Sequence, residues 1–298
     1  MKKTMIILLA AYLALSPGLT KSALALDAPE NALRPRGGFD PFMTETLESC
    51  QTAAVPWEND ADFITAKDHN NCPVLMAAYK TVLHDPLPGE ESNVHLAARY
   101  ISGTVLEPGA VFSQNQTAGP YTTERGYSIG PTYIGTSYSE TIGGGVCKIA
   151  STLYNVAVLS DLQITERHHH GMPVPYVPYG QDATVSYGAK DFKFKNSTPG
   201  KILIWARGID NILYIGFYGQ TVPPQITWNH DVLKVLPAPI LQKTNKELPP
   251  NTEKVAHEGL DGAVVSSWIV RLYPDGTSNV KEMSLDYYRP LPWVIEKN

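Results

Sequence analysis

The stretch with the clearest chemical potential is a run of three glycines that leads to a cysteine, Gly143-Gly144-Gly145-Val146-Cys147. Apolar residues follow it at helical spacing, at Ile149, Leu153 and Val156, and predict an amphipathic helix with Cys147 in its first turn. The unpaired N–H groups and partial positive charge of a helix start favour a thiolate. Cys147 is therefore a candidate nucleophile or metal ligand, and the alternative is a small buried apolar residue.

Two histidines and an aspartate follow Cys147 along the chain. Residues 162–170 alternate like a strand, so His168 and His170 would point to the same face. Asp182 follows in a turn. A helix-start cysteine, then a histidine, then a polar partner is the order found in papain-like proteases, where the base activates the thiol and the third group orients the base. The set predicts acyl transfer through a thioester, by peptide hydrolysis or transpeptidation.

Backbone N–H groups of Gly143, Gly144 and Gly145 are the expected oxyanion donors for such a reaction. Two other readings stay open. Cys147, His168 and His170 would also give a zinc site, completed by Asp182 or water, but their spacing matches no standard zinc motif, so no cofactor is expected. The chain would otherwise be a non-catalytic wall-binding module, whose tyrosine-rich loop at 114–142 stacks on sugar rings.

The N-terminus has the features of a secretory signal peptide over residues 1–25. Met1-Lys2-Lys3 precedes a short apolar run, and Ala23-Leu24-Ala25 forms a cleavage signal. The apolar run is too short to span a bilayer comfortably, and no later segment is long and apolar enough. The sequence therefore predicts an exported protein, periplasmic, extracellular or at the cell surface, without a transmembrane segment after cleavage.

The composition and charge of the chain indicate which kinds of molecule it could bind. The net charge of −5 has no long runs, which argues against a nucleic-acid-binding surface. The 16 tyrosines, 24 prolines and 23 glycines fit strands and turns better than a helical bundle. Outside the cytoplasm the peptide stem of peptidoglycan is the obvious acyl substrate, so peptidoglycan or another cell-wall component is the expected partner.

The three cysteines of the chain predict one disulfide and one free thiol. An exported protein usually pairs its cysteines, and Cys50 and Cys72 are close in sequence. A disulfide between them would stabilise the fold by about 3 kcal/mol. Cys147 would remain free, which favours the functional reading of the glycine run.

The expected fold class is α+β, an antiparallel sheet with a few helices packed on it, plus a small C-terminal all-β module. The predicted order is a disulfide-containing segment at 26–89, a central domain at 90–220, a proline-rich linker at 221–252 and the β module at 253–298. Within the first segment, residues 74–79 are predicted as a short helical piece.

These motifs resemble the VanW family, which takes its name from a gene linked to glycopeptide resistance. The resemblance covers roughly residues 90–220. The matching positions include Leu106-Glu107-Pro108-Gly109, Phe112-Ser113, Asn115, Gly126-Tyr127, Gly143-Gly144-Gly145-Val146-Cys147, Ser151-Thr152-Leu153-Tyr154-Asn155, Glu166-Arg167-His168, His170, Tyr176-Val177-Pro178, Gly180 and Asp182-Ala183-Thr184-Val185.

The resemblance implies a cell-envelope protein with a vancomycin-resistance-like context, and it leaves open whether the chain is an enzyme. If it is one, it is a thiol-dependent hydrolase or acyltransferase. Among the matched positions, Asn115, Tyr127 and Tyr154 are the expected substrate-binding residues. The chain departs from the family at Lys148, where glutamine is frequent, and at Gly171, where serine is frequent. Lys148 would stabilise a neighbouring thiolate further.

Overall fold

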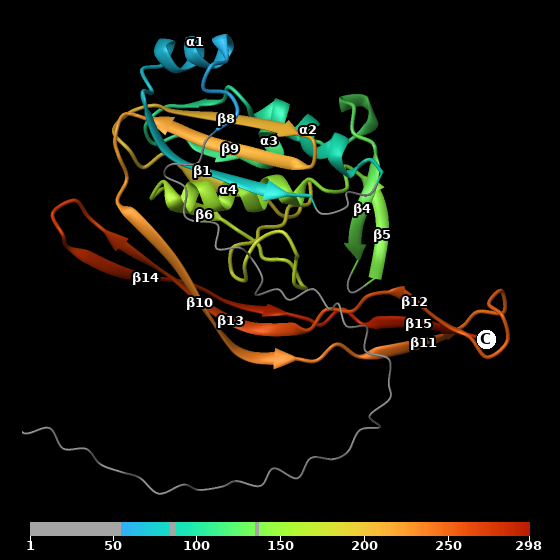
Figure 1. The fold of residues 1–298 in the computed structure, drawn as a ribbon. Coiled ribbons are helices and arrows are strands. Elements are labelled where there is room, and N and C mark those ends of the chain that lie inside the picture. The colour runs from blue at the N-terminus through green and yellow to red at the C-terminus, as the bar shows by residue number, and fades with distance from the viewer. Residues whose placement is uncertain (1–54, 84–87, 135–136) are drawn as a thin grey trace, which may run out of the picture. The chain divides into compact units, whose positions relative to one another are not determined.

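The structure, a computed structural model, describes residues 55–83, 88–134 and 137–298 (Figure 1). The predicted signal peptide and Cys50 lie outside these ranges. The fold is α+β, as predicted, with antiparallel sheets and few helices. The helical elements are α1 (Ala61–His69), α2 (Glu90–Ile101), α3 (Gln114–Thr117), the 3-10 turn η1 (Thr123–Arg125) and α4 (Cys147–Leu159).

The strands of the N-terminal three quarters are short to medium in length and belong to several sheets. They are β1 (Val74–Val82), β2 (Val105–Leu106), β3 (Val111–Ser113), β4 (Ile129–Ile134), β5 (Ser137–Ile142), β6 (Gln163–Glu166), β7 (Lys193–Lys195), β8 (Ile202–Ile209) and β9 (Ile212–Gly219). The C-terminal strands are β10 (Gln225–Leu236), β11 (Ile240–Thr244), β12 (Glu253–His257), β13 (Gly262–Leu272), β14 (Ser278–Tyr288) and β15 (Trp293–Lys297).

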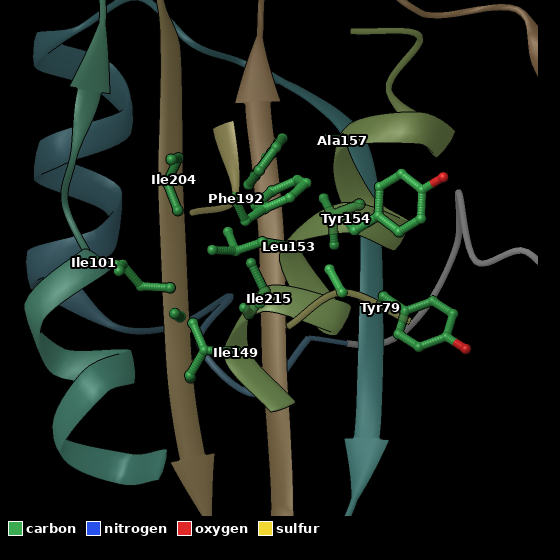
Figure 2. Close-up of a cluster of buried hydrophobic side chains, with 14 of the residues drawn as sticks. Tyr79, Ile101, Ile149, Leu153, Tyr154, Ala157, Phe192, Ile204 and Ile215 are labelled. Atoms are coloured by element: carbon green, nitrogen blue, oxygen red, sulfur yellow. The ribbon is translucent and has the colours of Figure 1, made fainter. Parts of the chain in front are cut away.

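A four-stranded antiparallel sheet in the order β1-β9-β8-β2 forms the centre of the fold. Strands β8 and β9 are apolar and buried along most of their length, as expected for a sheet that is covered on both faces. One face packs against α2 and α4, and Figure 2 shows Ile149 and Leu153 of α4 beside Ile204 and Ile215 of the sheet. The other face packs against the α1 region through Trp57, as part of a separate apolar cluster. The helix that begins at Cys147 is thus fixed on the central sheet.

Residues 74–82 form strand β1, where the sequence predicted a short helix over 74–79. Because β1 pairs with β9, this part of the predicted N-terminal segment belongs to the same sheet as the central domain. A short apolar run fits a buried strand and a buried helix equally well, and here the pairing with β9 decides.

The segment predicted as a linker, 221–252, contains two strands. β10 pairs with β13, and β11 pairs in parallel with β15, so the C-terminal β region begins at β10 and not at residue 253. The strands of this region form two three-stranded sheets, in the orders β10-β13-β14 and β11-β15-β12 (Figure 1). The prolines of the segment flank the strands, at Pro223, Pro224, Pro237 and Pro239.

Cys72 has a free thiol among the described residues, and its predicted disulfide partner, Cys50, lies outside them. Its side chain is fully buried in the cluster around Trp57 and Phe63, and its Sγ lies 3.5 Å from the carbonyl oxygens of Asn70 and Lys201. Burial raises the pKa of this thiol and makes it unreactive. Within the described part of the chain, no helix has both the length and the apolar character needed to cross a membrane.

Candidate active site

Helix α4 begins at Cys147, as the glycine run and the apolar spacing predicted. Gly143 and Gly145 have φ angles of 78° and 99°, the left-handed region that glycine adopts without strain. Gly144 lies against strand β4, where a Cβ atom would come within 2.2 Å of the carbonyl group of Gly130. The glycines therefore allow a tight turn that packs directly on a neighbouring backbone and then delivers Cys147.

The N–H groups of the glycine turn are partly engaged within the protein. Gly143 donates to the carbonyl of Ser128 at 2.9 Å, and Gly144 donates to the carbonyl of Thr141 at 3.1 Å. These two N–H groups tie the turn to the β4–β5 hairpin. In the structure these N–H groups stabilise the turn, whereas the sequence analysis predicted them as oxyanion donors.

The sulfur of Cys147 is half-buried and surrounded by polar groups. Its Sγ lies 3.3 Å from Oγ1 of Thr184 and 3.6 Å from the carbonyl oxygen of Val185, and the ring of His170 interacts with it as well. Burial alone would raise the pKa of this thiol, but the hydrogen bond and the charge of His170 outweigh it and lower the pKa to about 7. A thiol with this pKa is largely ionised just above neutral pH.

His170 is held by Asp182. Its Nδ1 lies 2.7 Å from Oδ2 of Asp182, and its backbone N–H donates to the same oxygen at 2.6 Å. A carboxylate accepts hydrogen bonds, so Nδ1 carries the proton and Nε2 is left for the sulfur and for the hydroxyl of Tyr176, 3.5 Å away. Burial opposes a charge on His170, but Asp182 and Cys147 raise the pKa of the imidazole to about 9.

The helix that carries Cys147 also positions Asp182. The Oγ of Ser151 in α4 accepts from the N–H of Ala183 at 2.9 Å and donates to the carbonyl of the same residue at 3.0 Å. One turn further on, the amide of Asn155 donates to the carbonyl of Gln181 at 2.8 Å. Since these bonds flank Asp182, α4 sets the distance between the sulfur and the carboxylate.

His168 does not join this cluster. Strand β6 ends at Glu166, so the alternation expected through residue 170 stops before the histidines. The Nε2 of His168 lies 3.0 Å from Glu166, and its side chain is 38% exposed, against 17% for His170. Of the two histidines predicted to share a face, the structure therefore places His170, and not His168, beside Cys147 and Asp182. Among the described residues, no group of three or more His, Cys, Asp and Glu side chains could hold a metal ion.

The second carboxylate oxygen of Asp182 is bound by residues distant in sequence. The hydroxyl of Tyr288, in β14, donates to Oδ1 at 2.6 Å, and Arg167 Nη2 lies 3.1 Å from it. Arg167 also pairs with Asp286 of β14, through Nη1 at 2.8 Å. Burial would raise the pKa of Asp182, but the hydrogen bond to His170 and the charges of His170 and Arg167 hold it well below its usual range. Asp182 is therefore a fully hydrogen-bonded, ionised carboxylate.

The residues predicted to bind substrate are buried and bonded internally. Asn115 donates through Nδ2 to the carbonyl of Lys190 at 2.8 Å, and Tyr127 donates through its hydroxyl to the carbonyl of Ala118 at 2.8 Å. Tyr154, on the buried face of α4, lies beneath the guanidinium of Arg167, 5.2 Å from its ring. The polar groups of Asn115 and Tyr127 are thus engaged within the protein, and of the three residues Tyr154 contacts the cluster, through Arg167.

Lys148, which was expected to stabilise the thiolate of Cys147, has other partners. Its Nζ forms an ion pair with Glu90 of α2 and lies 4.8 Å above the ring of Tyr176. The group that stabilises the charge on Cys147 is therefore His170, as the causes of the lowered cysteine pKa also indicate.

Five residues of the cluster were not singled out as site residues from the sequence. Arg167, Tyr176 and Thr184 stand within the motifs that resemble the family, and that resemblance was their only signal. Asp286 and Tyr288 gave no signal, because they come from a strand more than 100 residues further along the chain.

Comparisons with known proteins agree with the motifs. The family described as VanW like protein matches residues 89–218. An "Uncharacterized protein YoaR" of Bacillus subtilis (strain 168) is 37% identical over 147 residues, 49% of this chain and 48% of that protein. The "Vancomycin B-type resistance protein VanW" of Enterococcus faecalis (strain ATCC 700802 / V583) is 30% identical over 138 residues, 45% of this chain and 50% of that protein.

The chain thus spans about half the length of the curated relatives it matches. A solved structure, "Crystal structure of HP0197-G5", is 18% identical, with a TM-score of 0.15, and covers 25% of this chain and 99% of that one. The family match contains Cys147, His170 and Asp182. Residues 89–218 therefore form a VanW-like domain.

Proposed function

We propose that Cys147, His170 and Asp182 form a thiol-dependent acyl-transfer site that acts on the peptide stem of peptidoglycan. Two observations carry the proposal: Nδ1 of His170 is hydrogen-bonded to Asp182, and the same imidazole lowers the pKa of the Cys147 thiol. The three residues provide a nucleophile, a base beside it and a group that orients the base, the three parts that nucleophilic catalysis requires.

The charges of the resting site suit the first step. With the pKa of Cys147 at about 7 and that of His170 at about 9, thiolate and imidazolium coexist near neutral pH. The thiolate attacks the carbonyl carbon of an amide and forms a carbon–sulfur bond. His170 gives its Nε2 proton to the leaving amine as the carbon–nitrogen bond breaks, which leaves a thioester on Cys147.

The second step decides between hydrolysis and transpeptidation. Neutral His170 takes a proton from water or from an acceptor amine, whose oxygen or nitrogen attacks the thioester carbon. The carbon–sulfur bond breaks and the thiolate returns, beside imidazolium. Asp182 stays ionised throughout and stabilises the charge on His170, as its four donors support.

The cell-wall substrate rests on context. One relative carries the name of a vancomycin resistance protein, and the N-terminal sequence has the form of a signal peptide. Peptide stems of the wall offer the amide bonds that such a site would cleave or exchange. The same context would suit a protein that binds the wall without chemistry.

Turnover of purified peptidoglycan fragments tests the proposal. The wild-type chain, Cys147→Ser and His168→Gln are incubated with stem-peptide fragments, and the products are separated by chromatography and mass. We expect the wild type and His168→Gln to convert the fragments and Cys147→Ser to be inactive. Wall binding by wild type and Cys147→Ser alike, with no conversion by either, would support the binding module instead. Loss of conversion after treatment with a chelator would point to the zinc alternative.

A further inference from the structure

The C-terminal sheet enters the site through the last residues of β14. Asp286 and Tyr288 are buried, while Tyr287 between them is half exposed, as expected for alternating side chains along a strand. The pair faces Asp182 and Arg167, and the next residue, Arg289, donates its backbone N–H to the carbonyl of Gly171 at 2.9 Å. Asp286, Tyr288 and Arg289 all lie outside the family match at 89–218.

The two oxygens of Asp182 have separate tasks. Oδ2 accepts both the ring N–H and the backbone N–H of His170, whereas Oδ1 accepts from Tyr288 and Arg167. Donors on both oxygens fix the plane of the carboxylate, and the plane determines where the imidazole points. Tyr288 thus supplies one of the constraints on His170 without touching it.

The hydroxyl of Tyr288 has a defined direction. It accepts from the N–H of Gly180 at 3.0 Å, so its own proton is free to donate. The nearest acceptor is Oδ1 of Asp182 at 2.6 Å, against 3.3 Å for Oδ2 of Asp286. Burial and the two carboxylates raise the pKa of Tyr288, so the phenol keeps this proton at every pH relevant to the site.

Arg167 balances the charge between the two parts of the chain. Its guanidinium lies between the carboxylates of Asp182 and Asp286, and its Nε donates to the carbonyl of Asp182 at 2.8 Å. Asp286 therefore keeps Arg167 from being drawn wholly to Asp182, where it would compete with His170 for the carboxylate.

We propose that Tyr288 is a positioning residue for the Cys147–His170–Asp182 cluster, with Asp286 in support, so that strand β14 of the C-terminal sheet is a working part of the site. This inference rests on the proposed function, because positioning matters only if the cluster is catalytic. The effect of Tyr288 on His170 can nevertheless be measured without an activity assay.

The test compares Tyr288→Phe with Tyr287→Phe in the full chain. Tyr288→Phe keeps the ring that packs on Tyr179 and removes only the hydroxyl, and Tyr287→Phe makes the same change on the exposed face of the same strand. The imidazole of His170 is titrated by nuclear magnetic resonance, and the rate of iodoacetamide labelling at Cys147 is followed against pH by peptide mass spectrometry.

Without the hydroxyl, Arg167 is the remaining side-chain donor on Oδ1 and turns the carboxylate away from His170. We expect the pKa of His170 to fall by about 0.5 unit or more and labelling of Cys147 at pH 6.5 to slow about 3-fold. Tyr287→Phe should match the wild type in both. A pKa of His170 that is unchanged or raised in Tyr288→Phe would overturn the inference.

Asp286→Asn provides a second route if Tyr288→Phe does not fold. It removes a negative charge near the imidazolium and frees Arg167 to pair with Asp182, so the pKa of His170 should again fall; an unchanged value would overturn the role of β14. The two proposals fail separately. Failure of the wild type to convert wall peptides, with a lowered His170 pKa in Tyr288→Phe, rejects the reaction and keeps the positioning. If the wild type converts wall peptides but neither Tyr288→Phe nor Asp286→Asn changes the pKa of His170, the reaction is kept and the positioning role is rejected.

Discussion

A single oxygen of Asp182, Oδ2, accepts two hydrogen bonds from His170, one from Nδ1 at 2.7 Å and one from the backbone N–H at 2.6 Å. The ring and the main chain of His170 are thereby fixed by the same atom. Because Asp182 is itself tied to helix α4 through Ser151 and Ala183, the imidazole has one orientation relative to Cys147. Both stability and reactivity of the site depend on this carboxylate.

Asp182→Asn should destabilise the fold by about 3–5 kcal/mol, because it removes the shared negative partner of two buried ion pairs, with His170 and with Arg167. Thermal or urea unfolding at pH 7 measures this loss. Glu166→Gln is the control, since its carboxylate is about one third exposed and paired at the surface with Lys193. Equal stability of Asp182→Asn and the wild type would contradict the account.

The dependence of unfolding free energy on pH in the acid range also reports on the ionised carboxylate of Asp182. The pKa of Asp182 is lower in the folded chain than its ordinary value of 3.8. The stability it contributes is therefore present above about pH 4 and is lost as pH falls below that toward the folded pKa. Asp182→Asn should lack this component, so its unfolding free energy should fall less steeply than that of the wild type below pH 4.

The two neighbouring histidines should respond differently to replacement. His170→Gln removes the partner of Cys147 and should raise the midpoint of iodoacetamide labelling from about 7 toward that of a free cysteine, about 8.5. His168→Gln should leave the midpoint unchanged, because the ring of His168 is bonded to Glu166. A rise with His168→Gln and none with His170→Gln would reverse the assignment.

Gly144→Ala should disrupt the turn before Cys147. A Cβ at this position would lie 2.2 Å from backbone atoms of Gly130, which cannot yield as a flexible side chain can. We expect a loss of about 1–3 kcal/mol in unfolding free energy and slower labelling of Cys147 at neutral pH. Gly171→Ala is the matched control, since nothing lies within 4 Å of its added methyl group. Similar melting temperatures for the two variants would speak against the close packing of the turn.

Local patterns predicted the parts of the fold that depend on local chemistry. The start of α4 followed from the glycines and the apolar spacing after Cys147, and the patterns at 201–206 and 212–218 predicted the strands that the structure shows as β8 and β9. Strand β1 escaped prediction because its apolar run has no period that separates strand from helix. Strand β10 escaped because prolines flank it and its partner β13 is distant in sequence.

The site was predictable in composition but not in geometry. Cysteine, histidine and aspartate in this order indicated the chemistry, yet the choice between His168 and His170 depended on where β6 ends, at Glu166. Tyr288 and Asp286 could not be predicted as site residues, because their contacts with Asp182 and Arg167 arise only when the C-terminal sheet packs on the central domain. Long-range contacts of this kind leave no trace in local spacing.

The rate of Cys147 labelling by iodoacetamide, measured from pH 5 to pH 10, tests the central claim most directly. Peptide mass spectrometry separates this thiol from the buried Cys72, whose pKa is raised. The account predicts a labelling midpoint for Cys147 near 7, with appreciable reaction below neutral pH, and a rise of that midpoint in His170→Gln. A midpoint above 8 in the wild type, unmoved by His170→Gln, would contradict it.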